Sequence, residues 1–237
     1  MWTNSLLKQN GKLNMKKNYW YCVVASVVLG ICVGGSSGGS AYNSTQNSAS
    51  SSGSWISEID PAIITAILGA AGIAIIIGII IKIALFNPLE VGCQKFFIMN
   101  RVEPKAELGY IAFGLKNNWK NVVKTMFLTH LFQALWTLLF IIPGIIKGYS
   151  YRLVPYIMAE NPDMDSNDAI TLSRSMMNGQ KMNAFIYDLS FLGWIILTLF
   201  TCGILGIFYV GPYKACSDAE LYTAIKENYN PQNTVLQ

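Results

Sequence analysis

The stretch AIITAILGAAGIAIIIGIII, residues 62–81, contains no charged residue and eleven Ile or Leu. As a helix that rises about 1.5 Å per residue, twenty residues reach across the ~30 Å hydrocarbon core of a bilayer. Each Ile or Leu near the centre of such a helix favours insertion by roughly 0.3–0.6 kcal/mol. The stretch therefore predicts a membrane-spanning helix, and with it a protein that has the lipid bilayer as its first partner.

The composition of the whole chain agrees with a membrane protein. Only 13% of the 237 residues are charged, against about 25% in a soluble domain. The net charge is +4, and no basic stripe alternates with aromatic residues, so we expect no nucleic-acid partner. The five cysteines form no CxxC pair and have no histidine at ligand spacing. This pattern favours buried thiols and predicts no metal or other cofactor.

Further apolar stretches extend the prediction to an all-α, polytopic transmembrane bundle of about six spans in helical hairpins. The predicted spans are 19–33, 62–81, 122–142, 145–159, 182–200 and a sixth that begins at 204–213. A membrane-embedded domain thus covers 61–227. The remaining segments are a cytoplasmic N-terminal segment 1–18, a Ser/Gly-rich external loop 34–60 and a disordered tail 228–237.

Two parts of this topology have alternatives. Residues 1–41 also fit a cleaved signal peptide, with Gly39-Ser40-Ala41 as the cleavage site. The Pro143-Gly144 pair predicts a tight turn between the third and fourth spans. Because the returning stretch 145–159 contains Lys147 and Arg152, a single kinked helix over 122–159 is the alternative to a hairpin.

Small residues recur every fourth position along the second span, which places them on one face of the helix. A neighbouring backbone can approach such a face closely, so we predict a helix-packing face. Its members are Ala62, Ala66, Ala70, Ala74 and Gly78.

Two helices are predicted at the inner membrane surface. The first begins with Asn87 as N-cap and Pro88 at the first helical position, and runs to about 101 at an angle to the membrane or along it. The second is amphipathic, begins at a cap supplied by Asp165 or Ser166 and stops at Gly179.

Polar residues within the predicted spans form a candidate intramembrane polar cluster of His130, Gln133, Arg152 and Asp188. A charge in mid-bilayer costs about 2.5–3.5 kcal/mol, so such groups face the interior and find partners. We therefore predict that Arg152 and Asp188 lie close together. The cluster is either a substrate or proton site, or a structural clamp between helices.

The sequence contains no HExxH or P-loop motif. We accordingly expect a non-enzymatic membrane protein that scaffolds, senses or assists other membrane components, alone or as a homo-oligomer or with another membrane protein. The alternative is a small permease or export subunit, and an intramembrane enzyme ranks third. A dry, closed bundle would favour the scaffold, whereas a continuous polar cavity that reaches His130 or Asp188 would favour the permease.

The stretch LWTLLFIIPGIIK at 135–147 resembles a bacterial membrane family, domain of unknown function 975. The resemblance continues through Asn161-Pro162, Asp168-Ala169-Ile170, the Leu189–Trp194 stretch and Pro212-Tyr213. A looser similarity, around 160–193, is to membrane domains that accompany some glycerophosphodiester phosphodiesterases. The family implies a multi-pass protein of a bacterial cell membrane and supplies no activity, so no functional residue is carried over.

The lysine asymmetry across the first two spans predicts that both termini are cytoplasmic and that 34–57 is external. In intact cells, a membrane-impermeant thiol reagent should label Ser48→Cys and spare Asn228→Cys. Labelling of the tail but not of the loop would overturn this topology.

Overall fold

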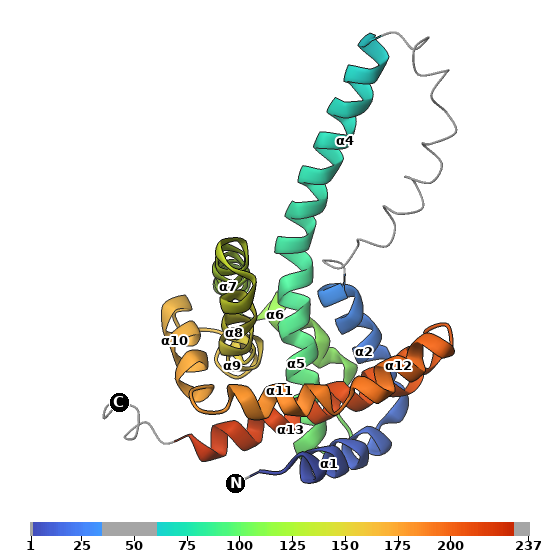
Figure 1. Ribbon diagram of the computed structural model, residues 1–237, viewed down its shortest axis with the longest axis vertical. Helices are drawn as coiled ribbons and strands as arrows, with labels where there is room; N and C mark the ends of the chain where they lie inside the picture. Colours follow the sequence, from blue (N-terminus) through green and yellow to red (C-terminus); the bar gives the residue numbers. More distant parts are fainter. Residues whose placement is uncertain (1, 35–60, 230–237) are drawn as a thin grey trace.

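The computed structural model describes residues 2–34 and 61–229, and for 61–68 it describes the backbone alone. These residues form helices joined by short turns and include no β-strand, so the predicted all-α class is confirmed for them (Figure 1). Most of the predicted external loop and of the predicted tail lies outside the described residues.

One long helical rod carries the most apolar stretch of the chain. It consists of α4 (Pro61–Ile81), the π-helical segment η2 (Lys82–Phe86) and α5 (Asn87–Val102). Figure 1 shows α4 standing clear of the other helices while α5 runs among them. The predicted helix start at Asn87 is therefore wrong, since Asn87 has helical dihedral angles and the rod continues through it.

The rod continues past Pro88 because a side chain from another helix replaces a lost backbone hydrogen bond. Proline has no backbone N–H, so the carbonyl four residues earlier loses its helical partner. That carbonyl belongs to Ala84, and the indole Nε1 of Trp119 donates to it at 2.8 Å. A side chain from another helix thus satisfies the acceptor that Pro88 leaves open, and no break is needed.

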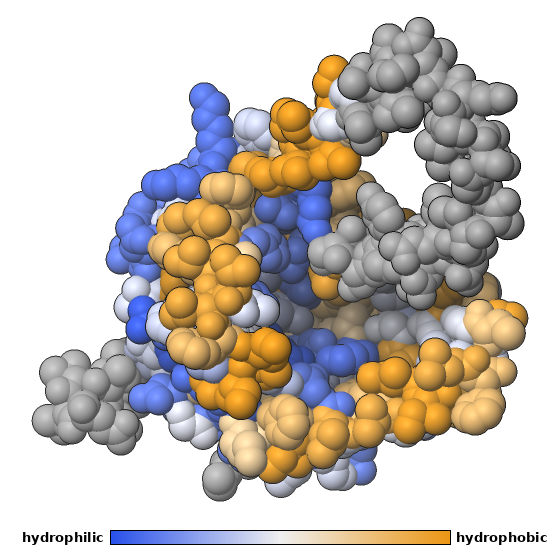
Figure 2. All heavy atoms as spheres, turned by 45° about the horizontal axis from the view of Figure 1, so that its top comes forward, coloured by the Kyte–Doolittle hydropathy of each residue, from blue (hydrophilic) through white to orange (hydrophobic). Residues whose placement is uncertain are grey.

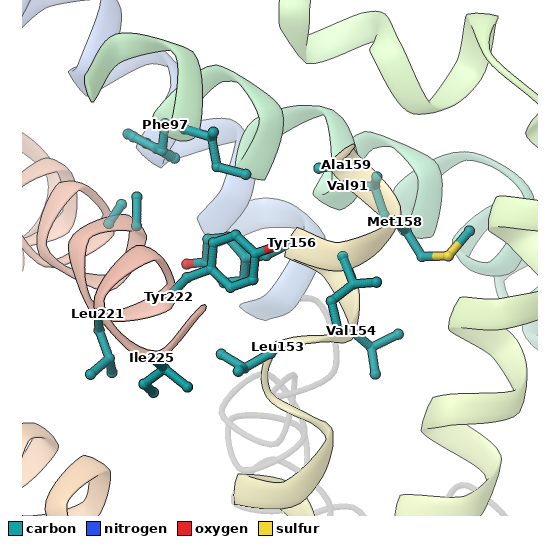
Figure 3. Packing of buried hydrophobic residues seen from close by; sticks show 14 of the residues in the cluster. Val91, Phe97, Leu153, Val154, Tyr156, Met158, Ala159, Leu221, Tyr222 and Ile225 are labelled. Atoms are coloured by element: carbon teal, nitrogen blue, oxygen red, sulfur yellow. The ribbon is translucent and has the colours of Figure 1, made fainter. Parts of the chain in front are cut away.

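The helix α5 is the centre of the fold, not a surface helix as predicted. Val91, Cys93 and Phe96 on it are fully buried, and α2 (Tyr19–Gly34) and α9 (Val154–Glu160) pack against it. Figure 3 shows the adjoining core, in which the rings of Tyr156 and Tyr222 stack with centroids 5.0 Å apart. Hydropathy predicted a helix at the bilayer, but the apolar face of α5 is covered by protein.

Close backbone approaches also hold α5 in place. The short helices η3 (Leu108–Ala112) and α6 (Phe113–Lys116) fold back onto it. A Cβ at Gly92 would lie 1.8 Å from the carbonyl oxygen of Ile111, so only glycine fits there.

The N-terminal segment is a helix, α1 (Asn4–Lys17), and the chain bends by 109° between it and α2. It packs along α13 (Gly211–Asn228), where a Cβ at Gly11 would lie 2.1 Å from the Ser217 hydroxyl oxygen. Asn14 Nδ2 donates to Glu220 Oε1 at 2.7 Å across the same contact. Segment 1–18 is therefore a packed helix at one end of the fold.

Residues 119–151 form a hairpin of α7 (Trp119–Leu139) and α8 (Ile141–Tyr151), which supports the hairpin over the kinked helix. The turn lies at Phe140, whose backbone is extended, and not at Pro143-Gly144 as predicted. Pro143 instead sits in the first turn of α8, where its missing N–H is tolerated. Gly144 lets α8 approach α7, because a Cβ there would lie 2.6 Å from the Cα of Thr137.

The C-terminal half confirms one predicted helix start and one predicted helix stop. The helix α10 (Ser166–Met176) begins at Asp165, whose side chain accepts from the Asn167 amide, and Gly179 follows it with φ +73°. The helices α11 (Lys181–Leu189) and α12 (Leu192–Phe200) are separated by a short break. A turn with Cys202 and Gly203 at positive φ then leads through the π-helical η4 (Gly206–Val210) into α13.

The described residues contain three helices long and apolar enough to cross a membrane, or four if α1 and α2 count as one bent span. The three are Gly69–Val102, Trp119–Leu139 and Lys181–Phe200. These helices support a membrane location, whereas the predicted count of six is not confirmed. The stretch 145–159 divides into α8 and the core helix α9, and Figure 1 shows α11, α12 and α13 running across the direction of α4.

The predicted packing face on α4 has no neighbour in the described chain. Ala70, Ala74 and Gly78 are exposed, and a Cβ at Gly78 would meet nothing within 4 Å. Ala62 and Ala66 belong to the residues 61–68, which are described by their backbone alone. Close packing on this face stays a prediction.

We predict that Gly92→Ala lowers the free energy of unfolding by about 1–3 kcal/mol, because the added methyl forces α5 and η3 apart. Gly72→Ala on the exposed part of α4 is the matched control, since nothing lies within 4 Å of its Cβ. Thermal unfolding of both purified variants in one detergent measures the difference. A Gly92→Ala protein as stable as the control would contradict the tight contact.

Candidate functional site

The described helices enclose a groove of about 1510 Å³. Its walls come from α2, α5, α7 to α9, α11 to α13 and η4. Figure 2 shows apolar side chains gathered on the projecting helices and hydrophilic ones in the hollow between them. Apolar walls with a few convergent polar groups are the usual make-up of a ligand site.

Arg152 and Asp188 form the central contact of the groove, as the sequence predicted. Arg152 Nη1 and Nη2 donate to Asp188 Oδ2 and Oδ1 at 2.6 and 3.1 Å, a bidentate arrangement. Arg152 caps the C-terminus of α8, and Asp188 lies in α11. The contact therefore joins two helices through residues that are 36 positions apart in the sequence.

Two further charges from α13 complete the cluster. Asp218 Oδ1 accepts from Arg152 Nη2 at 2.9 Å, and Lys214 Nζ lies 3.0 Å from Asp188 Oδ1. Lys214 also donates to both carboxylate oxygens of Asp218, one helical turn away. Each cation of this four-residue charge cluster thus contacts both carboxylates, so the cluster is neutral in itself.

Tyrosine hydroxyls fill the remaining hydrogen-bonding positions of the charge cluster. Tyr149 donates to Asp188 Oδ2 at 3.0 Å, and Tyr187 donates to Asp218 Oδ1 at 2.9 Å. Burial by itself lowers the pKa of Arg152, but Asp218 and Asp188 outweigh it and raise that pKa above its usual value. The guanidinium therefore stays charged, and the cluster acts as a clamp between α8, α11 and α13.

The α5 side of the groove carries polar groups of a different kind. Glu90 and Gln94 line it from α5, and His130 and Gln133 face them from α7. A smaller hollow of about 380 Å³ adjoins this side and is lined by Lys82, Cys32 and His130, among others. This side lacks the mutual pairing that neutralises the charge cluster.

The four residues singled out from the sequence all line the groove. Arg152 and Asp188 meet directly, whereas His130 and Gln133 stand on the α7 wall, so a common role for the four stays a prediction. Further polar groups of the groove were not predicted from the sequence, among them Glu90, Gln94, Tyr149, Lys214 and Asp218. The spacing of Lys214 and Asp218, one helical turn apart, was the signal available for that pair.

A second buried polar network lies between α1, α5 and α13. Asn100 Nδ2 donates to the carbonyl of Asn14 at 2.9 Å, and Arg101 Nε donates to Glu220 Oε1 at 3.0 Å. None of these residues lines the groove. They fix α1 to the core. Among residues 2–34 and 61–229, no group of three His, Cys, Asp or Glu side chains is arranged to hold a metal ion.

Residues 138–229 match the model of a family described as "Protein of unknown function (DUF975)". The resemblance found in the sequence is confirmed over this part of the chain, and all four members of the charge cluster lie within it. The looser similarity to phosphodiesterase-associated membrane domains stays a prediction. The chain has no significant match among curated proteins or among solved structures.

We predict that Asp188→Asn lowers the free energy of unfolding by about 1–3 kcal/mol, because Arg152 and Lys214 lose a shared counter-charge. Adding Arg152→Gln should restore part of this loss, so that the double-mutant cycle shows a coupling energy. Lys124→Gln is the control, since its ion pair with Asp165 is exposed and 3.9 Å long. Strictly additive losses for the two groove variants would refute the clamp.

Proposed function

We propose that this membrane protein, whose residues 138–229 carry the domain of unknown function 975, is a small permease or export subunit for an amphipathic solute. One observation carries the proposal: a continuous groove of about 1510 Å³ reaches both His130 and Asp188. A closed scaffold has no use for such a space. A permease needs it, because its solute must leave both water and lipid while it crosses.

The lining of the groove matches a solute with two chemically different ends. Apolar side chains such as Leu29, Leu138 and Ile195 form parts of the wall and can cover a hydrocarbon chain. Polar groups such as Gln133, together with Glu90 and Gln94, can receive a polar head. In a bilayer, the burial of these polar groups away from lipid is itself typical of a solute pathway.

The charge cluster has a supporting role in this proposal. Since its two cations and two carboxylates satisfy one another, it can keep α8, α11 and α13 together while a solute occupies the space beside them. We further propose that the protein resides in a bacterial cell membrane with both termini cytoplasmic. It would act without catalysis, in contact with lipid and with a second copy or another membrane protein.

A scaffold or accessory role remains the second candidate, and the exposure of α4 favours it. Ala70, Ala74 and Gly78 face no other described helix, so a partner helix could pack on them. Cysteine cross-linking from Ala70→Cys in native membranes tests this role. A discrete cross-linked partner would support it, whereas a monomer that reacts only with lipid would count against it.

The permease proposal predicts that Ala134→Trp blocks the groove, because Ala134 lines it from α7. Proteoliposomes with the unchanged protein should move a fluorescent alkyl amphiphile across the bilayer faster than protein-free liposomes do. Ala134→Trp should remove most of this acceleration, about tenfold or more.

Leu135→Trp is the matched control on the same helix, since Leu135 is exposed and does not line the groove. It should retain the rate of the unchanged protein. Equal rates for the two tryptophan variants, or no acceleration by any form of the protein, would contradict a permease that works through the groove.

A further inference from the structure

Two side chains on the α5 side of the groove have oxygen acceptors without a donor among the described residues. Glu90 and Gln94 lie one helical turn apart, line the groove, and are only 9% and 7% exposed. Gln94 Oε1 is the one buried side-chain nitrogen or oxygen of the described chain without a hydrogen-bond partner. Neither a hydrogen bond nor an ion pair joins Glu90 to another described residue. Such groups are costly to bury alone, so a donor from beyond the described residues is expected.

The charge balance of the groove identifies what kind of donor is missing. The lining contains three carboxylates but only two permanently cationic side chains. Arg152 and Lys214 are both committed to Asp188 and Asp218, so within the groove no described cation forms an ion pair with Glu90. Lys82 shares the adjoining hollow with Glu90, two helical turns away, but forms no ion pair with it. His130, the remaining titratable neighbour, faces this region from α7.

We propose that Glu90 and Gln94 bind the ammonium group of an amphipathic primary amine. The single positive charge of an ammonium balances Glu90, and its three N–H groups can serve both the carboxylate and Gln94 Oε1. A divalent metal ion fits less well, because it takes six or more oxygen ligands. The nearby apolar wall, including Leu29 and Val33, covers the hydrocarbon part of the amine.

This inference rests on the proposed function, since it names the chemical class of the solute for the same groove. The test uses three probes with one alkyl chain: octylammonium, 1-octanol and octanoate. Isothermal titration of the full-length protein in zwitterionic nanodiscs, corrected for empty nanodiscs, gives the three affinities. Octylammonium should bind about tenfold or more tightly than 1-octanol, and octanoate should bind most weakly.

Glu90→Gln should abolish the preference for octylammonium and leave the affinity for 1-octanol unchanged. Gln94→Leu should weaken octylammonium binding several-fold while the carboxylate remains. Glu103→Gln is the matched control, because Glu103 follows α5 outside the groove and accepts from Tyr110. It should preserve all three affinities. Circular dichroism of each variant establishes that the helical fold is retained.

The outcomes separate this inference from the function on which it rests. Equal binding of the three probes, all blocked by Ala134→Trp, would leave the permease proposal standing and overturn the amine assignment. Unchanged octylammonium affinity in both Glu90→Gln and Gln94→Leu would overturn it as well. If Glu90→Gln fails to fold, unchanged affinity in Gln94→Leu alone is sufficient to refute the assignment. Absence of binding by every probe would overturn both proposals.

Discussion

The contact of Arg152 with two carboxylates from different helices is the interaction on which the rest of the structure depends. Arg152 sits at the end of α8, Asp188 in α11 and Asp218 in α13, so one guanidinium joins three segments. If it were absent, the two carboxylates would face each other across a partly desolvated space with Lys214 alone between them. The same three residues line the groove, which means that helix packing and the candidate site depend on one contact.

Local chemistry allowed much of the secondary structure to be predicted, because caps and turns depend on few residues. Asp165 and Gly179 are examples. The assembly was harder to predict. Hydropathy measures how strongly a segment avoids water, but it does not distinguish burial in lipid from burial in protein. The helices α5 and α9 were assigned to the membrane or its surface for this reason, and both belong to the protein core.

For the same reason, only part of the candidate site could be predicted from the sequence. Arg152 and Asp188 were predicted to pair because each interrupts an apolar stretch and needs a partner. Lys214 directly follows the apolar stretch 204–213 and Glu90 follows Asn87-Pro88, places where a charge needs no buried partner. Only the packing of α5 and α13 into the centre makes their surroundings buried. Their part in the groove follows from tertiary structure, which no single segment of the sequence reveals.

The π-helical segment at 82–86 has a consequence for the orientation of α4. Its hydrogen bond runs from the Asn87 amide to the Lys82 carbonyl, which is one residue more than an α-helical turn holds. Since each α-helical residue turns the chain by about 100°, this extra residue offsets the angular phase of α4 against α5. The side of α4 that carries Ala70 and Ala74 is therefore set independently of the side of α5 that faces the groove. Deletion of one residue from the segment 82–86 would rotate α4 about its own axis and leave the core unchanged.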